Sequence, residues 1–216
     1  MTSLFARPIR RPGLLGRVML LVLLALAAGC ASTPRLTFSG SLGDYSQLQI
    51  DSERTDSALW RKPDAPFANY KKVMIDMPYL YVDPKAGDRR LDPDLKNQLV
   101  EEMRAALTER LGAAYLVVKE PGPDTLRVRA AITNLMPTGK PSQGMTSAVM
   151  RVPVTFKESH MEAEALDSLT AERLLAIADS RRGRDLSTVT NEVKWEDVRS
   201  LMRDWSDALV RALAAH

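Results

Sequence analysis

Apolar residues recur at two different spacings along this chain of 216 residues, and the spacings predict a sheet covered by helices. A period of two is typical of strands, whereas a period of three to four is typical of helices. After Tyr70, the residues Val73, Ile75 and Met77 recur with a period of two and predict a strand, which YLYV at 79–82 is expected to continue. Because Pro78 cannot donate to a strand ladder, we expect this part of the sheet to be irregular.

Two longer segments carry the helical spacing. Residues 92–111 place leucine or methionine at every fourth position, with Asp92 able to cap the first turn and Gly112 to stop the last. Residues 194–214 predict a second amphipathic helix. Its apolar stripe consists of Trp195, Val198, Leu201, Met202, Trp205, Leu209, Ala212 and Leu213.

Shorter apolar runs predict further strands. YLVV at 115–118 is typical of a short buried strand, and residues 126–132 alternate with arginine and threonine as in a half-exposed strand. Residues 152–156 repeat apolar residues with a period of two. The stretch 160–180, HMEAEALDSLTAERLLAIADS, is compatible with a helix by propensity or with a hairpin that turns at Asp167 and Ser168.

The first thirty residues follow a different pattern. Residues 1–17 carry four arginines and no acid, residues 18–28 are apolar without a break, and small residues then lead to Cys30. This order is typical of a secretory signal peptide. The apolar run is shorter than the roughly 20 residues that a membrane-spanning helix needs. We therefore expect residues 1–29 to be removed by cleavage between Gly29 and Cys30.

Leu26-Ala27-Ala28-Gly29-Cys30 resembles the lipobox of bacterial lipoproteins. The resemblance implies a diacylglyceryl group on the Cys30 thiol and an acylated new amino terminus. Two or more acyl chains anchor a protein stably, whereas one chain binds only marginally. Ala31 follows the cysteine, and by the sorting rule of enteric bacteria a residue other than Asp there implies the periplasmic face of the outer membrane. The alternative is an uncleaved signal anchor in which the cysteine is incidental.

Removal of the signal changes the charge of the chain. The full sequence has a net charge of +3, but its first 29 residues hold four of the 30 basic side chains and none of the 27 acidic ones. The mature chain therefore has a net charge of −1. A basic protein would have suggested a nucleic-acid partner, and this balance gives no such indication.

Composition divides the rest of the chain into three parts. Residues 30–44 are rich in serine, glycine and proline and predict a lipidated cysteine followed by a tether. Residues 45–69 predict an irregular lead-in that packs on the domain, and residues 70–216 predict one α+β domain. Because the one cysteine would carry lipid, no disulfide and no cysteine-based metal site is expected.

Several stretches resemble a family of uncharacterised proteobacterial lipoproteins, domain of unknown function 3313. They are FSGSLGDYSQL (38–48), WRKPDAPFANYKKVMIDM (60–77), LTERLG (107–112), DTLRVRAAITNL (124–135) and MEAEALDSLTAERLLAIADSRRG (161–183). In that family the last stretch is a strand, an acidic turn and a second strand, which favours the hairpin. The expected fold is α+β, with a mixed, mainly antiparallel sheet and two long amphipathic helices packed on one face. The family supplies no known reaction and no site residue.

Few residues are suited to catalysis or metal binding. The two histidines are His160, expected in a solvent-facing loop, and the terminal His216. Gly139-Lys140 lacks the rest of a phosphate-binding loop. The many acidic residues are expected on solvated faces. We therefore predict no metal and no cofactor.

These observations favour a non-enzymatic binding or assembly module that is anchored by lipid and faces the periplasm. Its partner would be an envelope protein or ligand rather than a nucleic acid. The candidate partner surface consists of Trp60, Lys140, Arg181, Arg182 and Arg184. The alternative is a periplasmic hydrolase that acts on peptidoglycan or glycan through paired carboxylates.

Overall fold

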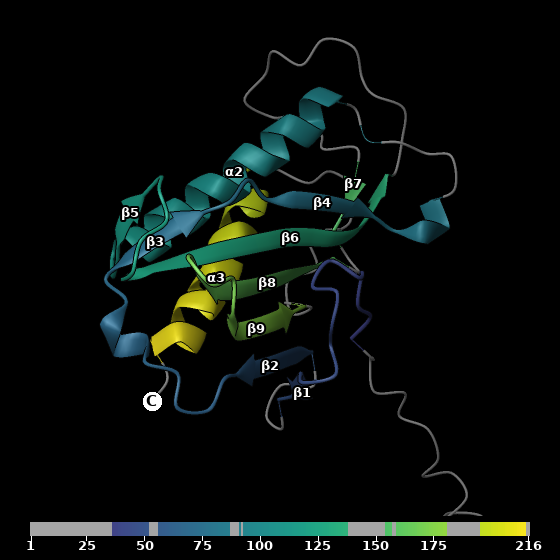
Figure 1. Cartoon of the computed structure of the whole chain (residues 1–216). Coiled ribbons are helices and arrows are strands. Elements are labelled where there is room, and N and C mark those ends of the chain that lie inside the picture. The colour runs from purple at the N-terminus through teal and green to yellow at the C-terminus, as the bar shows by residue number, and fades with distance from the viewer. Residues whose placement is uncertain are drawn as a thin grey trace, which may run out of the picture. The chain divides into compact units, whose positions relative to one another are not determined.

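The structure is a computed structural model that describes residues 36–51, 56–86, 91, 93–137, 154–156, 159–180 and 195–214 (Figure 1). Its strands are β1 (Gln49–Ile50), β2 (Ser57–Arg61), β3 (Lys72–Ile75), β4 (Tyr79–Val82), β5 (Leu116–Val118), β6 (Thr125–Pro137), β7 (Val154–Thr155), β8 (His160–Asp167) and β9 (Arg173–Asp179). Its helices are α2 (Pro93–Gly112) and α3 (Trp195–Ala214), with short 3₁₀ turns η1 (Phe67–Asn69) and η2 (Pro84–Ala86).

The strands form one mixed sheet in the order β1-β2-β9-β8-β6-β3-β5, and β4 and β7 also pair with β6. The pairs β1–β2, β2–β9, β9–β8, β8–β6 and β6–β7 are antiparallel. The pairs that β3 makes with β5 and β6, and β4 makes with β6, are parallel. The prediction of a mixed, mainly antiparallel sheet is confirmed.

Both helices pack on one face of this sheet, and Figure 1 shows them behind the strands. The buried stripes predicted for the two helices are confirmed, and they share one apolar core with alternate residues of the central strands. On β6 these are Val128, Ala130 and Ile132, and on β8 Met161 and Ala163. The residues between them point to the opposite side of the sheet, which we call the open face.

β3 and β4 lie one after the other along β6, so YLYV continues the strand beyond Pro78 as predicted. Lys72–Ile75 pair with Thr125–Val128, and Tyr79–Val82 pair with Ala131–Leu135. β6 itself contains a bulge. Asn134 has a positive φ of 55°, and the residues two before and one after it, Ile132 and Leu135, both face the core.

The hairpin prediction for residues 160–180 is confirmed, and the helix alternative is wrong. β8 and β9 pair across a turn that Asp167 organises, since its Oδ1 accepts hydrogen bonds from the amides of Leu169 (3.0 Å) and Thr170 (2.8 Å). Its Oδ2 accepts a bond of 2.8 Å from the hydroxyl of Tyr70. Burial raises the pKa of Asp167, but the hydrogen bonds together outweigh burial and hold the pKa below its usual value.

Two strand predictions need correction. Residues 115–118 do form β5, but as an edge strand whose Leu116 is 64% exposed rather than buried. The lead-in 45–69 is not irregular throughout, because β2 pairs along its full length with β9. Ala58 lies opposite Ala178 in this pair.

β2 also contacts the end of α3. The Arg61 Nη1 donates to the carbonyl oxygens of Ala212 (2.6 Å) and Leu213 (3.1 Å), and the guanidinium lies 4.0 Å from the centre of the Phe67 ring. A cation at this place satisfies carbonyl groups that a helix leaves without partners in its last turn. Arg61 therefore ties the edge of the sheet to the helix layer.

Candidate functional site

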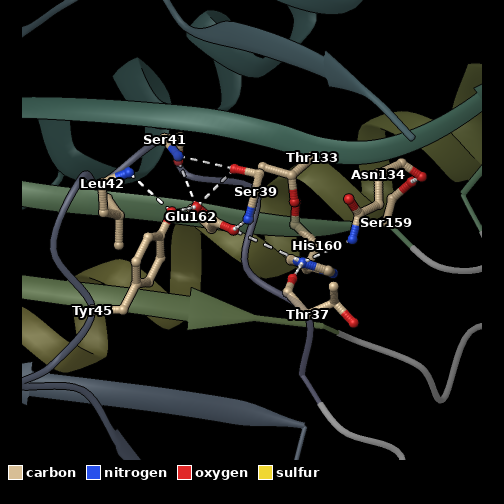
Figure 2. Close-up of polar contacts among 10 residues, drawn as sticks. All are labelled: Thr37, Ser39, Ser41, Leu42, Tyr45, Thr133, Asn134, Ser159, His160 and Glu162. Atoms are coloured by element: carbon tan, nitrogen blue, oxygen red, sulfur yellow. Dashed lines mark hydrogen bonds and ion pairs between the residues drawn. The ribbon is translucent and has the colours of Figure 1, made fainter. Parts of the chain in front are cut away.

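A cluster of polar side chains on the open face binds the start of the described chain. Residues 36–45, which we call the docked segment, cross the strands on the side away from the helices (Figure 2). The prediction that residues 30–44 form a free tether is therefore wrong for 36–44. These residues are fixed to the sheet through their backbone and through serine side chains.

Glu162 is the centre of this cluster. It is fully buried and accepts four hydrogen bonds from the docked segment. Its Oε1 accepts from the amide of Ser39 (2.7 Å), and its Oε2 accepts from the hydroxyls of Ser39 (2.9 Å), Ser41 (2.5 Å) and Tyr45 (2.6 Å). The Tyr45 hydroxyl in turn accepts from the amide of Leu42 at 3.1 Å. A buried carboxylate needs such donors to replace the water that it loses.

The neighbours of Glu162 in the sheet leave room for the docked segment. Its register partners are Ala131 on β6 and Ala178 on β9, both with small side chains. Because residues on a strand alternate between faces, Met161 and Ala163 point into the core while Glu162 points to the open face.

His160 also contacts the docked segment, so its prediction as a solvent-facing loop residue is wrong. It is the first residue of β8 and only 2% exposed. Its Nε2 bonds the carbonyl oxygen of Thr37, and since a carbonyl only accepts, this nitrogen donates. The same Nε2 lies 3.3 Å from the Asn134 Nδ2 and 3.9 Å from the Glu162 Oε1. The bulge in β6 thus lies beside the histidine.

A second buried carboxylate continues the cluster toward the hairpin. Glu164 is contacted by the Arg129 Nη1 at 3.2 Å and by the Arg173 Nε at 2.7 Å. The two remaining guanidinium nitrogens of Arg173 donate to the carbonyl oxygens of Leu42 and Asp44. Arg173 therefore joins the docked segment to β8 and β9, and the open face holds the segment by two acids rather than one.

An aromatic pair covers the outer side of the cluster. The rings of Phe38 and Tyr45 stack with 4.5 Å between their centres. Burial of the hydroxyl, followed by its hydrogen bond to Glu162, raises the pKa of Tyr45. Tyr45 therefore stays a neutral donor to Glu162 at neutral pH.

The space beside the two carboxylates is small. A cavity of about 20 Å³ lies there. It is lined by Ser41, Leu42, Tyr79, Arg129, Ala130, Ala131, Glu162 and Glu164. A volume of this size holds about one water molecule and no sugar ring. The expectation that acidic residues lie on solvated faces is wrong for Glu162 and Glu164, which the docked segment encloses.

A larger hollow of about 340 Å³ lies between β4 and α2. It is lined by Met77, Pro78, Tyr79, Leu80, Lys96, Asn97, Val100 and Glu101. Its one carboxylate, Glu101, has no second acid beside it in this lining, so the hollow lacks the paired carboxylates that a glycosidase needs.

The structure brings together few of the site residues predicted from sequence. Trp60 lies half-buried in β2, opposite Ala176 and therefore on the open face. Gly29, Cys30, Lys140, Arg181, Arg182 and Arg184 lie outside the described residues.

Sequence reasoning missed the cluster on the open face. Its members from the segment are Ser39, Ser41 and Tyr45, and from the sheet His160, Glu162, Glu164 and Arg173. A signal was available in MEAEAL, where acids alternate with alanine and methionine in a strand whose neighbours are also rich in alanine. That pattern is compatible with acids buried under another segment.

Within the part of the chain that the structure describes, no three histidine, cysteine or acidic side chains are grouped to hold a metal ion. No helix among the described residues is both long and apolar enough to cross a bilayer.

The fold and the cluster define a class: a two-layer α+β domain with helices on one face of the sheet and its own N-terminal segment bound to the other. The family model for the protein of unknown function DUF3313 matches residues 37–209. The chain belongs to this family, as the resemblance indicated. The match begins within the docked segment, so the family's sequence pattern includes it.

This chain also has a distant likeness to several solved structures. PelC from Paraburkholderia phytofirmans, solved as a dodecamer, has 11% identity over 74% of this chain and 99% of that one, with a TM-score of 0.36. A DUF4136 family protein from Bacteroides thetaiotaomicron has 10% identity over 78% of this chain and 98% of that one, with a TM-score of 0.39. Comparison with curated proteins finds no match. These likenesses are too distant to indicate a function.

Proposed function

We propose that this protein is a lipid-anchored module of the cell envelope that binds another envelope component and does not catalyse a reaction. Cys30 carries the lipid, and the domain faces the periplasm from the outer membrane. The observation that carries the proposal is the docked segment, which begins six residues after Cys30 and is held by buried acids.

The docked segment shortens the tether. Among the described residues, the first that is bonded to the sheet is Thr37, seven positions after Cys30. Seven extended residues reach at most about 25 Å. A tether that ran freely to residue 44 would reach about 50 Å. The domain is therefore kept close to the membrane that holds the acyl chains, which suits a protein that positions a partner at the envelope.

The polar cluster supports binding over hydrolysis. A glycosidase needs two carboxylates on either side of a space for a sugar ring. Here Glu162 and Glu164 are engaged by the chain's own donors, and the cavity beside them measures about 20 Å³. The acids that a hydrolase would use are thus employed to fix the N-terminal segment.

The anchor is tested by the intact mass of the mature protein purified from its own envelope. We expect an N-terminal Cys30 that carries a diacylglyceryl group and an additional acyl chain, and a membrane-bound protein. The Cys30→Ser variant should retain its signal or appear unlipidated in the soluble periplasmic fraction. A wild-type chain with an unmodified thiol would refute the proposal.

The binding role is tested by crosslinking in living cells followed by mass spectrometry, on wild type and Cys30→Ser. We expect one envelope protein to crosslink to wild type and to be lost in the variant. The Trp60→Ala variant tests whether the partner uses the open face near β2, since Trp60 is half-exposed there. If no envelope component crosslinks to wild type, the binding role is refuted.

A further inference from the structure

The exposed apolar side chains of this domain are gathered on one side of the sheet. Of the eight large hydrophobic residues that are exposed among the described ones, five belong to the open face or to the docked segment on it. They are Phe38, Ile50, Tyr79, Tyr81 and Leu116. Single exposed apolar residues need no explanation, but the gathering of five of the eight on one side of the sheet calls for one.

The strand register establishes the face of each of these residues. Tyr79 lines the small cavity with Arg129 and Glu164, and Tyr81 follows it two positions later on the same strand. Leu116 is paired with Lys72, whose neighbour Val73 faces the core.

At the other end of the sheet, Ile50 is paired with Ala58, on the side of β2 opposite to the core residue Leu59. The five side chains therefore extend across the sheet from β1 to β5. We call them the apolar set.

The charged side chains of the open face are paired with one another. The pairs are Arg127–Asp76 (2.8 Å), Arg129–Glu164 (3.2 Å), Arg173–Glu164 (2.7 Å) and Lys72–Asp124 (3.1 Å). These pairs hold four basic and three acidic side chains, and Glu162 on the same face brings the acids to four. An excess of basic residues would favour an anionic partner, and these charges balance. A neutral, amphipathic partner fits it better.

The entry point of the chain indicates which partner lies opposite. The docked segment approaches the domain on the open face, and its Phe38 belongs to the apolar set. Cys30 lies eight positions before Phe38, and eight extended residues span at most about 29 Å. If lipid at Cys30 holds this end, the membrane lies within that distance of the open face, whereas the helices lie on the far side of the sheet.

We infer that the open face rests on the surface of the bilayer in which the Cys30 lipid is inserted, with Phe38, Tyr79 and Tyr81 at the level of the lipid headgroups. Tyrosine is suited to this place because its ring is apolar and its hydroxyl remains in contact with water. The inference rests on the lipid anchor proposed above. It assigns the domain a fixed orientation, with α2 and α3 turned away from the membrane.

The test is quenching of a fluorescent label by brominated lipid. In the lipidated chain Cys30 has no free thiol, so a single introduced cysteine takes the label. Tyr79→Cys reports on the open face, and Thr108→Cys, exposed on α2, is the control. The lipidated proteins are reconstituted in phosphatidylcholine vesicles with and without bromine on the acyl chains.

We expect brominated lipid to reduce the emission of the label at position 79 about twofold and to leave the label at position 108 unchanged. High salt should not reverse the quenching, because the apolar set rather than charge makes the contact. If brominated lipid reduces the emission of the labels at 79 and 108 by the same fraction, the inference is overturned.

A second pair of variants covers the case in which Tyr79→Cys does not fold. Leu116 and Val117 are adjacent on β5, are 64% and 39% exposed, and point to opposite faces. Quenching of the label at 116 and not at 117 supports the inference, and equal quenching overturns it. The intact mass separates the two proposals: a chain without lipid refutes the anchor and this surface together, whereas a lipidated chain whose label is not quenched refutes this surface alone.

Discussion

Replacement of Glu162 by alanine should release the docked segment while leaving the sheet and helices folded. The carboxylate accepts four hydrogen bonds, three from hydroxyls and one from the Ser39 amide. Hydrogen bonds to a charged group contribute about 1.5–3 kcal/mol each, and the cost of keeping the charge buried offsets part of that sum. We expect a loss of about 3 kcal/mol, which corresponds to a fall in melting temperature of about 6–12 °C for a domain of this size.

The sharper assay is hydrogen exchange at the amides of Ser39 and Leu42. Both depend on Glu162, the first directly and the second through the Tyr45 hydroxyl. Their exchange should accelerate about 100-fold, the factor that corresponds to about 3 kcal/mol. Glu162→Gln keeps one acceptor oxygen and should lose about half as much stability.

The matched control is Glu101→Ala. Glu101 lies on the exposed side of α2 and makes only a long ion pair of 3.7 Å with Arg104. Its loss should change the free energy of unfolding by less than about 0.5 kcal/mol. If Glu162→Ala leaves exchange at Ser39 unchanged, or matches the control in stability, the reasoning that the carboxylate holds the segment is refuted.

Three further changes test other parts of the fold. Arg61→Ala should cost about 1–2 kcal/mol in thermal unfolding because two carbonyl groups at the end of α3 lose their donor, and Arg61→Lys should restore part of it. Ala171→Gly should stabilise the hairpin by about 0.5–1 kcal/mol, since Ala171 has a φ of 57° that glycine adopts without strain, and a loss of stability would contradict this. Stability should be greatest between about pH 4 and pH 10. The pKa of Asp167 is lowered, so its contribution is present above its unfolded value and is lost as the pH falls. Burial, followed by the bond to Asp167, raises the pKa of Tyr70 to about 12, so its contribution is lost as the pH rises from 10 to 12, and Tyr70→Phe should flatten that alkaline limb in denaturant titrations.

Much of the fold follows from local patterns. The two helices carry unbroken stripes of apolar residues, so their positions agree with the sequence prediction to within a residue or two. The turn at Asp167 is likewise local, because the carboxylate bonds amides two and three positions further on.

The predictions that failed depend on neighbours distant in sequence. YLVV is apolar enough for a central strand, yet β5 is the last strand at one edge of the described sheet, and Leu116 is 64% exposed there. Ser57–Arg61 has no strong alternation and becomes a strand because β9 offers it an edge to pair with. Whether a strand lies at the edge or in the centre of a sheet depends on the whole topology, which no short sequence pattern encodes.

In the candidate site, too, local features were predicted from the sequence and features that depend on distant residues were not. The sequence indicated the N-terminal cysteine, the family and the scarcity of catalytic side chains, because each of these depends on residue types in a short window. It could not indicate that Glu162 and His160 are buried, since their cover comes from residues more than 110 positions earlier.

By itself, the sequence determined the two helices and the apolar faces of the central strands, and its resemblance to the family favoured the hairpin. Only the tertiary structure decided that the docked segment, residues 36–45, is bound to the sheet instead of free in solvent. The physical reason is that an acidic side chain in a strand looks the same in sequence whether water or another segment solvates it. The choice is made by which donors the fold brings to the carboxylate.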